Sequence, residues 1–226
     1  MKVGFMLTIE DILNLIPENG IMAVVQRDLE ANGDRYTLLI LKYLLEKGEL
    51  VFLFLYEPYT VLTRNLSNIG LNVGDFLDKN LIIFDVFGSV NKIEKNVKGV
   101  YTLSGYMDDV IFISKMKEWA GGVIRRQKIK VDKLWMVTYL SSGVCRLFQN
   151  PLYTYKMIWL MREDILKGKS PRTIITYSPV ECPLLEDIVY FVSDVVIETK
   201  IIKGKKVGII SKGPEENVIF ELFEER

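Results

Sequence analysis

The sequence predicts a single α/β domain of three layers, in which helices cover both faces of a mostly parallel sheet and antiparallel strands form its C-terminal edge. Short, wholly apolar runs alternate with segments that repeat apolar residues at helical spacing, the pattern of buried strands joined by helical crossovers. Near the C-terminus the pattern changes to short strands joined by turns. No Pro-, Gly- or Ser-rich linker and no repeat divides the 226 residues, so we expect one domain over residues 1–226.

The N-terminal part of the chain predicts the order helix, strand, helix, strand. Residues 9–16 place apolar side chains at helical spacing after Thr8, a typical N-cap residue. The apolar run of residues 21–26 (IMAVVQ) predicts the first core strand. A helix over residues 35–47 follows, and residues 50–56 (LVFLFLY) predict a central parallel strand.

The same unit recurs through the rest of the chain. We expect further helices over residues 59–69, 107–127 and 152–167, and further strands over residues 81–87, 134–140 and 172–177. The tail predicts edge strands over residues 192–202, 207–211 and 218–223, with Lys203, Lys205 and Lys206 on a solvent-exposed hairpin turn. Residues 88–105 leave two possibilities, an added strand or a mobile flap.

The composition excludes several classes of function. Lys plus Arg and Asp plus Glu balance at 29 each, so no overall field draws the protein onto nucleic acid or an anionic membrane. No apolar run approaches the roughly 20 residues of a membrane span and no signal peptide begins the chain, so we expect a cytoplasmic protein. The chain has no histidine, which excludes Ser-His-Asp and Cys-His catalysis and most zinc enzymes. Cys145 and Cys182 lie far apart in the sequence and indicate small buried apolar residues, not a zinc site or a disulfide framework.

The loop after the first core strand is where an open α/β sheet would hold a phosphate. A phosphate loop needs glycines that let backbone N–H groups wrap the phosphates, a lysine for the terminal ones and a hydroxyl on magnesium. Here residues 27–35 read RDLEANGDR. Aligned on the pattern GxxxxGK followed by Ser or Thr, Asp28 stands at the first glycine and Gly33 matches the second. Asp34 replaces the lysine and Arg35 replaces the hydroxyl residue.

Acidic residues at these positions oppose phosphate binding. A unit charge pair contributes about 4 kcal/mol at 4 Å and an effective dielectric near 20, so exchanging lysine for a carboxylate turns attraction into repulsion. Asp28, Glu30 and Asp34 together face a triphosphate that itself carries several negative charges. Arg27 and Arg35 offset part of this but lie outside the predicted cradle. We therefore expect no nucleotide cofactor, no metal and no ATP hydrolysis by the usual route.

Two other segments carry a family resemblance. Residues 57–85 resemble the stretch after the second strand of KaiC-like and other archaeal RecA-superfamily ATPases, and residues 184–202 resemble the passage into their final strands. The matching positions are Glu57, Pro58, Arg64, Asn65, Ile69, Gly70, the strand LIIFD, Glu186 and Asp194. The chain thus resembles a KaiC-like, RecA-superfamily P-loop domain with degenerate Walker motifs, except over residues 92–133. It also resembles KaiC-like paralogues of hyperthermophilic archaea that carry no assigned activity.

The resemblance implies a second diagnostic position, which also departs from the family. An active member ends the fourth strand with an aspartate that orders magnesium and water. In residues 134–142 (LWMVTYLSS) the matching position is Thr138 or its neighbour, and no carboxylate occurs from Leu134 to Asn150. Glu57 lies where the family places its water-activating carboxylate. Without the lysine and the aspartate, Glu57 is more simply a carboxylate at a helix N-terminus before Pro58.

Three hypotheses of function follow. The first is an inactive KaiC/RecA-like protein, a pseudo-ATPase, that acts in protein binding or assembly with itself or a paralogue. The aromatic and Met residues of segment 152–167 cover more than one helix side, so not all of them can face one sheet. We expect most of them to pack in the core, and an additional exposed apolar strip would indicate a partner surface. The second is a nucleic-acid-associated repair or signalling factor that uses the basic cluster Arg125, Arg126, Lys128 and Lys130, although such a cluster is usually a solvated helix end. The third is a nucleotide binder with a rearranged pocket near Glu57 and Arg64.

Overall fold

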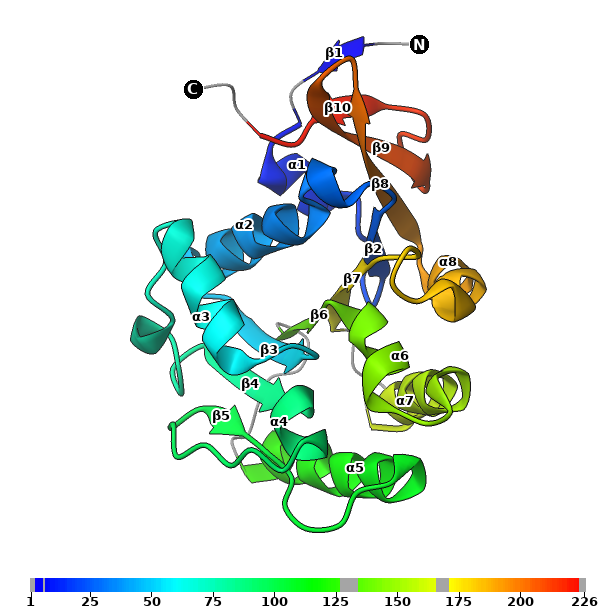
Figure 1. The fold of residues 1–226 in the computed structure, drawn as a ribbon. Helices are drawn as coiled ribbons and strands as arrows, with labels where there is room; N and C mark the ends of the chain where they lie inside the picture. The colour runs from blue at the N-terminus through cyan, green and yellow to red at the C-terminus, as the bar shows by residue number, and fades with distance from the viewer. Residues whose placement is uncertain (1–2, 6, 127–133, 166–170, 224–226) are drawn as a thin grey trace.

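A computed structural model describes residues 3–5, 7–126, 134–165 and 171–223. The strands of this part of the chain form one ten-stranded sheet in the order β1-β10-β9-β8-β2-β7-β6-β3-β4-β5 (Figure 1). The parallel part consists of β2 (Ile21–Gln26), β3 (Leu50–Leu55), β4 (Leu81–Asp85), β5 (Val100–Tyr101), β6 (Leu134–Tyr139), β7 (Arg172–Tyr177) and β8 (Val195–Ile202). Strand β9 (Lys205–Lys212) runs antiparallel to β8 and to β10 (Ile219–Glu221), and β1 (Val3–Phe5) pairs parallel with β10. The expected sheet, with antiparallel C-terminal edge strands, is confirmed.

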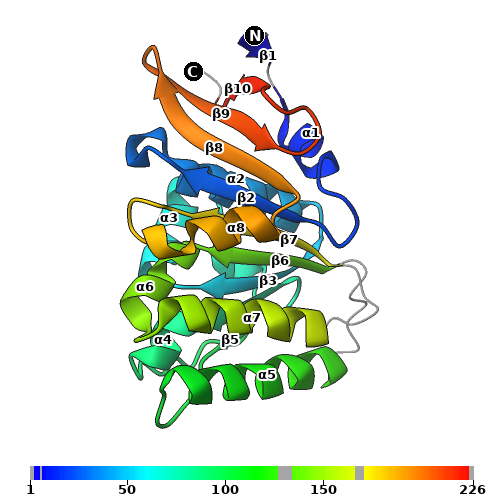
Figure 2. The ribbon, with the colours of Figure 1, turned by 90° about the vertical axis from the view of Figure 1, so that its right-hand side faces the viewer.

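Helices cover both faces of the parallel part (Figures 1 and 2). One face carries α1 (Ile9–Asn14), α2 (Gly33–Glu46) and α3 (Tyr59–Asn68), and the other carries α5 (Asp109–Arg126), α6 (Val144–Leu147), α7 (Pro151–Ile165) and α8 (Glu186–Val192). The short helix α4 (Val86–Val90) follows β4 directly. Each face has its own apolar core, so the domain has the three predicted layers.

Alternate residues of each central strand enter different cores. In β3, Val51, Leu53 and Leu55 pack toward α2 and α3, whereas Phe52 and Phe54 pack toward α5 and α7. Because both faces are covered, the strand reads as a continuous apolar run in the sequence.

The predicted elements are confirmed with boundaries shifted by up to three residues, and two of these shifts have a clear structural cause. The predicted strand 81–87 ends at Asp85, because the Asp85 side chain accepts a hydrogen bond from the Gly88 N–H and caps α4. The predicted strand 192–202 begins at Val195, and the preceding turns form α8, which the sequence analysis missed. Of the two possibilities for residues 88–105, an added strand is the one found, as the two-residue β5.

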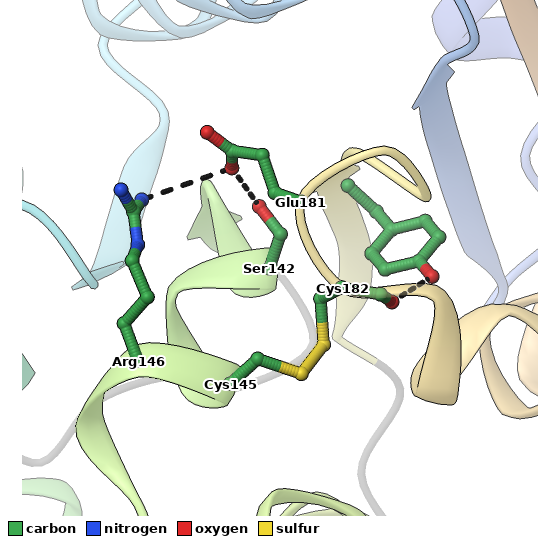
Figure 3. The surroundings of a disulfide bond; sticks show 6 residues. Ser142, Cys145, Arg146, Glu181 and Cys182 are labelled. Carbon is green, nitrogen blue, oxygen red and sulfur yellow. Dashed lines mark hydrogen bonds and ion pairs between the residues drawn. A yellow bond between two sulfur atoms is a disulfide. The ribbon is translucent and has the colours of Figure 1, made fainter.

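The expectation that the two cysteines are unpaired is wrong. Cys145 and Cys182 form a disulfide with a Cα–Cα distance of 5.7 Å (Figure 3). The two residues are 37 apart in the sequence, but they follow the neighbouring strands β6 and β7. The carboxyl ends of these parallel strands lie together, so the loops that carry the cysteines meet.

Neither a membrane-crossing helix nor a metal-binding group occurs in the described ranges. None of their helices combines the length and the hydropathy of a membrane span. These ranges also hold no group of three or more His, Cys, Asp or Glu residues placed to ligate a metal ion.

Candidate functional site

Four loops converge at the carboxyl edge of the parallel strands. Strands β2, β7, β6 and β3 are consecutive neighbours, and the pairing aligns Val25 with Tyr177 and Leu55 with Tyr139 near the ends of these strands. Such an edge is where open α/β folds bind ligands.

The loop after β2 satisfies its own backbone. Asp28 caps a 3₁₀ turn over Leu29–Ala31, and its carboxylate accepts a hydrogen bond from the Glu30 N–H at 2.9 Å. The Ala31 N–H donates to the Asp28 carbonyl at 3.1 Å, and the Asn32 N–H donates to the Leu29 carbonyl at 3.2 Å. Three consecutive amides, which a phosphate loop would turn toward its ligand, therefore have acceptors inside the loop.

The two positions at the start of α2 have structural partners. A Cβ atom on Gly33 would lie 2.6 Å from the Thr199 Oγ1 of β8, so glycine permits the close approach of the helix to the sheet. Asp34, at the lysine position, is half-buried and accepts a hydrogen bond from the Gln26 Nε2 at 3.1 Å. Gln26 is 4% exposed, so the side chain that ends β2 holds the Asp34 carboxylate in place.

The two arginines that flank the loop point elsewhere. Arg27 binds the Tyr190 hydroxyl at 2.9 Å and Glu198 at 3.2 Å, and it pairs with Glu186 of α8. The Arg35 guanidinium lies over the Phe223 ring, 5.7 Å from its centroid. Both side chains join the loop region to neighbouring structure and leave the acidic positions without compensation.

Glu57, directly after β3, has an unsatisfied carboxylate. Its Oε1 atom is buried without a hydrogen-bond partner. Burial, followed by the negative charge of Asp34, raises the pKa of Glu57 to about 7, while Arg64 and Arg146 oppose this rise and Glu181 adds to it. Arg64 itself is exposed on α3. The predicted pair Glu57 and Arg64 therefore lies in one electrostatic environment with Asp34 of the loop after β2.

Thr138 and Tyr139 of β6 face opposite sides of the sheet. Thr138, the predicted Walker B position, lines an apolar cavity of about 50 Å³ with Phe52 and Phe54 under α5 and α7. Tyr139, its neighbour, is fully buried in the α2 and α3 core, and its hydroxyl forms no hydrogen bond of normal geometry. Burial raises the pKa of Tyr139, and the nearby charges of Glu57 and Asp34 raise it further. Of these two residues, only Tyr139 lies beside the acidic side chains. The alternation of side chains along a strand could have predicted this from the sequence.

The loop after β6 contributes residues that the sequence analysis missed. The Ser142 hydroxyl donates to the Glu181 Oε2 at 2.7 Å, and the Arg146 Nη2 lies 3.7 Å from the same oxygen (Figure 3). The disulfide joins these same two segments. A Cβ atom on Gly143 would lie 2.8 Å from the Tyr56 Cβ, so the loop packs tightly against the residue before Glu57.

Arg125 and Arg126, the described part of the predicted basic cluster, lie in a helix that ends away from this site. Arg125 and Arg126 end α5, which leads toward the start of β6 at the opposite, amino edge of the strands (Figure 2). Lys128 and Lys130 lie outside the described residues. The structure thus does not bring Arg125 and Arg126 together with the loop positions 28–35.

Comparisons with known proteins identify the fold. No protein-family model matches the sequence, and no curated protein matches it. The fold is similar to protein PH0321 of Pyrococcus horikoshii, crystallised in complex with an unknown peptide, with a TM-score of 0.78, 23% identity and coverage of 93% of this chain and 90% of that one. It is also similar to the KaiC-like protein PH0186 of Pyrococcus horikoshii OT3 (TM-score 0.63, 16% identity, 91% of each chain). The flagellar accessory protein FlaH of Methanocaldococcus jannaschii gives a TM-score of 0.58 at 14% identity, over 91% of this chain and 86% of that one.

The chain therefore has a fold like that of these proteins, one of them KaiC-like, as the resemblance of residues 57–85 and 184–202 predicts. At these levels of identity the likeness concerns the fold, and activity has to be argued from the site.

Proposed function

We propose that this protein is a pseudo-ATPase: a KaiC-like domain that does not hydrolyse ATP and acts by binding a protein partner. The observation that carries the proposal is the loop after β2. Its amides are occupied by Asp28 and by its own carbonyls, and Asp34 stands where a lysine would meet the terminal phosphates.

The electrostatic argument against nucleotide binding rests on the same residues. Asp34 and Glu57 lie in one environment, and a triphosphate would bring further negative charge to it. Arg27 and Arg35 are engaged with α8 and with Phe223, so neither offsets the repulsion. Arg64 and Arg146 remain on the rim, and the loop offers few free amides to support them.

An exposed apolar surface supports protein binding. Val180, Leu184 and Phe191 are 64%, 61% and 86% exposed, and we call them the α8 surface. Leu184 belongs to the 3₁₀ turn Pro183–Leu185 and Phe191 to α8, which follows it directly, and large exposed apolar side chains mark protein-binding sites. The similar protein PH0321 was crystallised with a peptide, which favours the same class of partner here.

The nucleotide part of the proposal is tested by calorimetry and thermal shift with Mg·ATP and Mg·ADP, and by a phosphate-release assay. We expect no saturable rise in melting temperature and no phosphate release. A saturable rise that disappears in Arg64→Ala would instead favour the rearranged nucleotide pocket.

The partner is sought by capture from native extract, with the wild-type chain and two matched variants. Phe191→Asp places a charge on the α8 surface, whereas Tyr106→Asp changes another exposed aromatic residue, which is 68% exposed before α5. We expect a captured protein to be lost with Phe191→Asp and kept with Tyr106→Asp. Light scattering over a concentration series tests whether the partner is a second copy; a strict monomer with nothing captured contradicts the proposal.

A further inference from the structure

The Cys145–Cys182 disulfide holds the middle of the α8 surface. Cys182 lies two residues from Val180 and two from Leu184, which are 64% and 61% exposed, whereas Cys182 itself is 0% exposed. Its partner Cys145 lies in α6, so the bond joins α6 to the segment after β7 (Figure 3). The α8 surface therefore has a covalent anchor between Val180 and Leu184.

Glu181 makes a noncovalent connection between the same two segments. Ser142 donates a hydrogen bond to its Oε2 atom at 2.7 Å, and the Arg146 Nη2 lies 3.7 Å from that oxygen. Glu181 and Arg146 are both exposed, so water competes for their contact. The backbone of Cys182 forms hydrogen bonds within its own segment, residues 177–185. Opening of the disulfide therefore replaces a covalent bond to α6 by exposed polar contacts.

The two ends of the disulfide differ in their exposure. Cys145 is partly exposed and is followed by the exposed Arg146, whereas Cys182 is fully buried. Thiol–disulfide exchange begins when a thiolate attacks one of the two sulfurs, so access decides which sulfur is attacked. A positive charge beside that sulfur also favours the approaching thiolate. Both observations place the attack at Cys145, with Cys182 as the leaving group.

We propose that this disulfide is a redox switch, which a dithiol opens by attack at Cys145 and which thereby releases the segment that carries Val180 and Leu184. The dithiol's thiolate forms a bond to the Cys145 sulfur as the bond to Cys182 breaks, and the Cys182 thiolate takes up a proton. The second thiol then attacks the dithiol sulfur of this mixed disulfide and releases Cys145. The protein gains two electrons and two protons, and the dithiol becomes a disulfide.

The switch acts on part of the α8 surface. Leu185 and Val189 are 0% exposed in the core, so they hold α8 and its Phe191 in place when the disulfide opens. Val180 and Leu184 lose the anchor between them, so the reduced protein presents a less ordered surface and binds its partner more weakly. This control of binding rests on the proposed function, whereas the attack at Cys145 does not.

The first experiment compares the two sulfurs. The chain has two cysteines, so Cys182→Ser and Cys145→Ser each leave a single thiol. Both variants are treated with oxidised glutathione, and the mixed disulfide is followed by mass spectrometry. We expect Cys145 to react at least about tenfold faster than Cys182. The oxidised wild-type chain needs no substitution: dithiothreitol should open its disulfide in native buffer, at a rate proportional to the reductant concentration.

The second experiment follows the released segment by hydrogen exchange of the full chain. In the wild type, dithiothreitol should raise the exchange rate of peptides covering residues 178–185 about tenfold and leave those of α2 unchanged. Cys145→Ser is the matched control, because it already lacks the bond and should not respond to dithiothreitol. Partner capture is then repeated with oxidised and reduced wild-type protein, and we expect about tenfold less captured protein after reduction.

Three results would overturn the switch: a disulfide that opens only when the protein unfolds, equal reactivity of the two single thiols, or exchange of residues 178–185 that reduction leaves unchanged. Equal capture by the oxidised and reduced protein, together with loss of capture in Phe191→Asp, would leave the proposed function standing and show that the switch is wrong. If Phe191→Asp captures as much as wild type, the proposed α8 surface fails, while the reactivity and exchange measurements still decide whether the disulfide opens at Cys145.

Discussion

Two nearby regions of the sheet edge differ in whether their polar groups have hydrogen-bond partners. The loop after β2 pairs its amides with its own oxygens through Asp28. Beyond the next strand, β7, the ends of β6 and β3 leave the Tyr139 hydroxyl without a hydrogen bond of normal geometry and the Glu57 Oε1 without a partner among the described residues. The first region pairs its amides internally, whereas the second keeps buried oxygens that lack such partners. Three amides of the loop after β2 therefore have acceptors within the loop, while unsatisfied oxygens lie at the ends of β6 and β3.

The largest expected effect concerns the two faces of β6. Thr138→Asp restores a carboxylate at the predicted Walker B position, but Thr138 is 8% exposed and lines the apolar cavity on the α5 and α7 side. We expect it to lower the free energy of unfolding by about 3 kcal/mol or more, because an unpaired charge is buried. Urea unfolding measures this loss, with Thr138→Val as the control of similar shape. A stable Thr138→Asp variant that gains magnesium binding would show that this side chain reaches the site.

The disulfide is expected to have the next largest effect, because it ties the loops that position Ser142 and Glu181. Cys145→Ser opens a cross-link that spans 37 residues, and chain-entropy estimates for such a loop give about 2–4 kcal/mol. Urea unfolding with and without reductant checks this. Reductant should lower the stability of the wild-type chain and leave that of Cys145→Ser unchanged. Equal stability of the two oxidised proteins would mean that the loops hold together without the bond.

The unsatisfied region predicts a stabilising substitution. The folded-state pKa of Glu57 is raised from 4.5 to about 7, so the stability that its proton contributes is present below pH 4.5 and is lost as the pH rises through 7. Glu57→Gln is neutral at every pH and escapes this loss. After allowance for solvent screening, we expect the variant to gain about 1–2 kcal/mol over wild type between pH 5 and pH 8. Glu18→Gln, changed at an exposed carboxylate, should show no such pH-dependent gain.

The sequence predicts the layers and most strands because burial on both faces leaves continuous apolar runs, as in residues 50–56. It predicts the acidic loop because residues 28–35 are contiguous. The remainder of the site depends on contacts between distant segments. The pairing of Cys145 with Cys182 and of Ser142 with Glu181 follows from the adjacency of β6 and β7, which no local pattern encodes. Tyr139 could have been predicted from the sequence, because side chains alternate along a strand and only one of two neighbouring residues can face this side.

The smallest expected effect tests the completed region. Asp28→Ala removes the side chain that accepts the Glu30 N–H, so the loop loses its cap at a cost of about 1 kcal/mol. Glu30→Ala is the matched control, since Glu30 is exposed and takes part in the cap through its backbone alone. Urea unfolding of both variants separates the lost cap from the lost charge.

Because the Ala31 and Asn32 amides keep their carbonyl acceptors in Asp28→Ala, we expect no Mg·ATP binding to appear with the freed Glu30 amide. Nucleotide binding regained by this one substitution would show that the Asp28 carboxylate alone blocks the cradle, and that the loop is not otherwise complete.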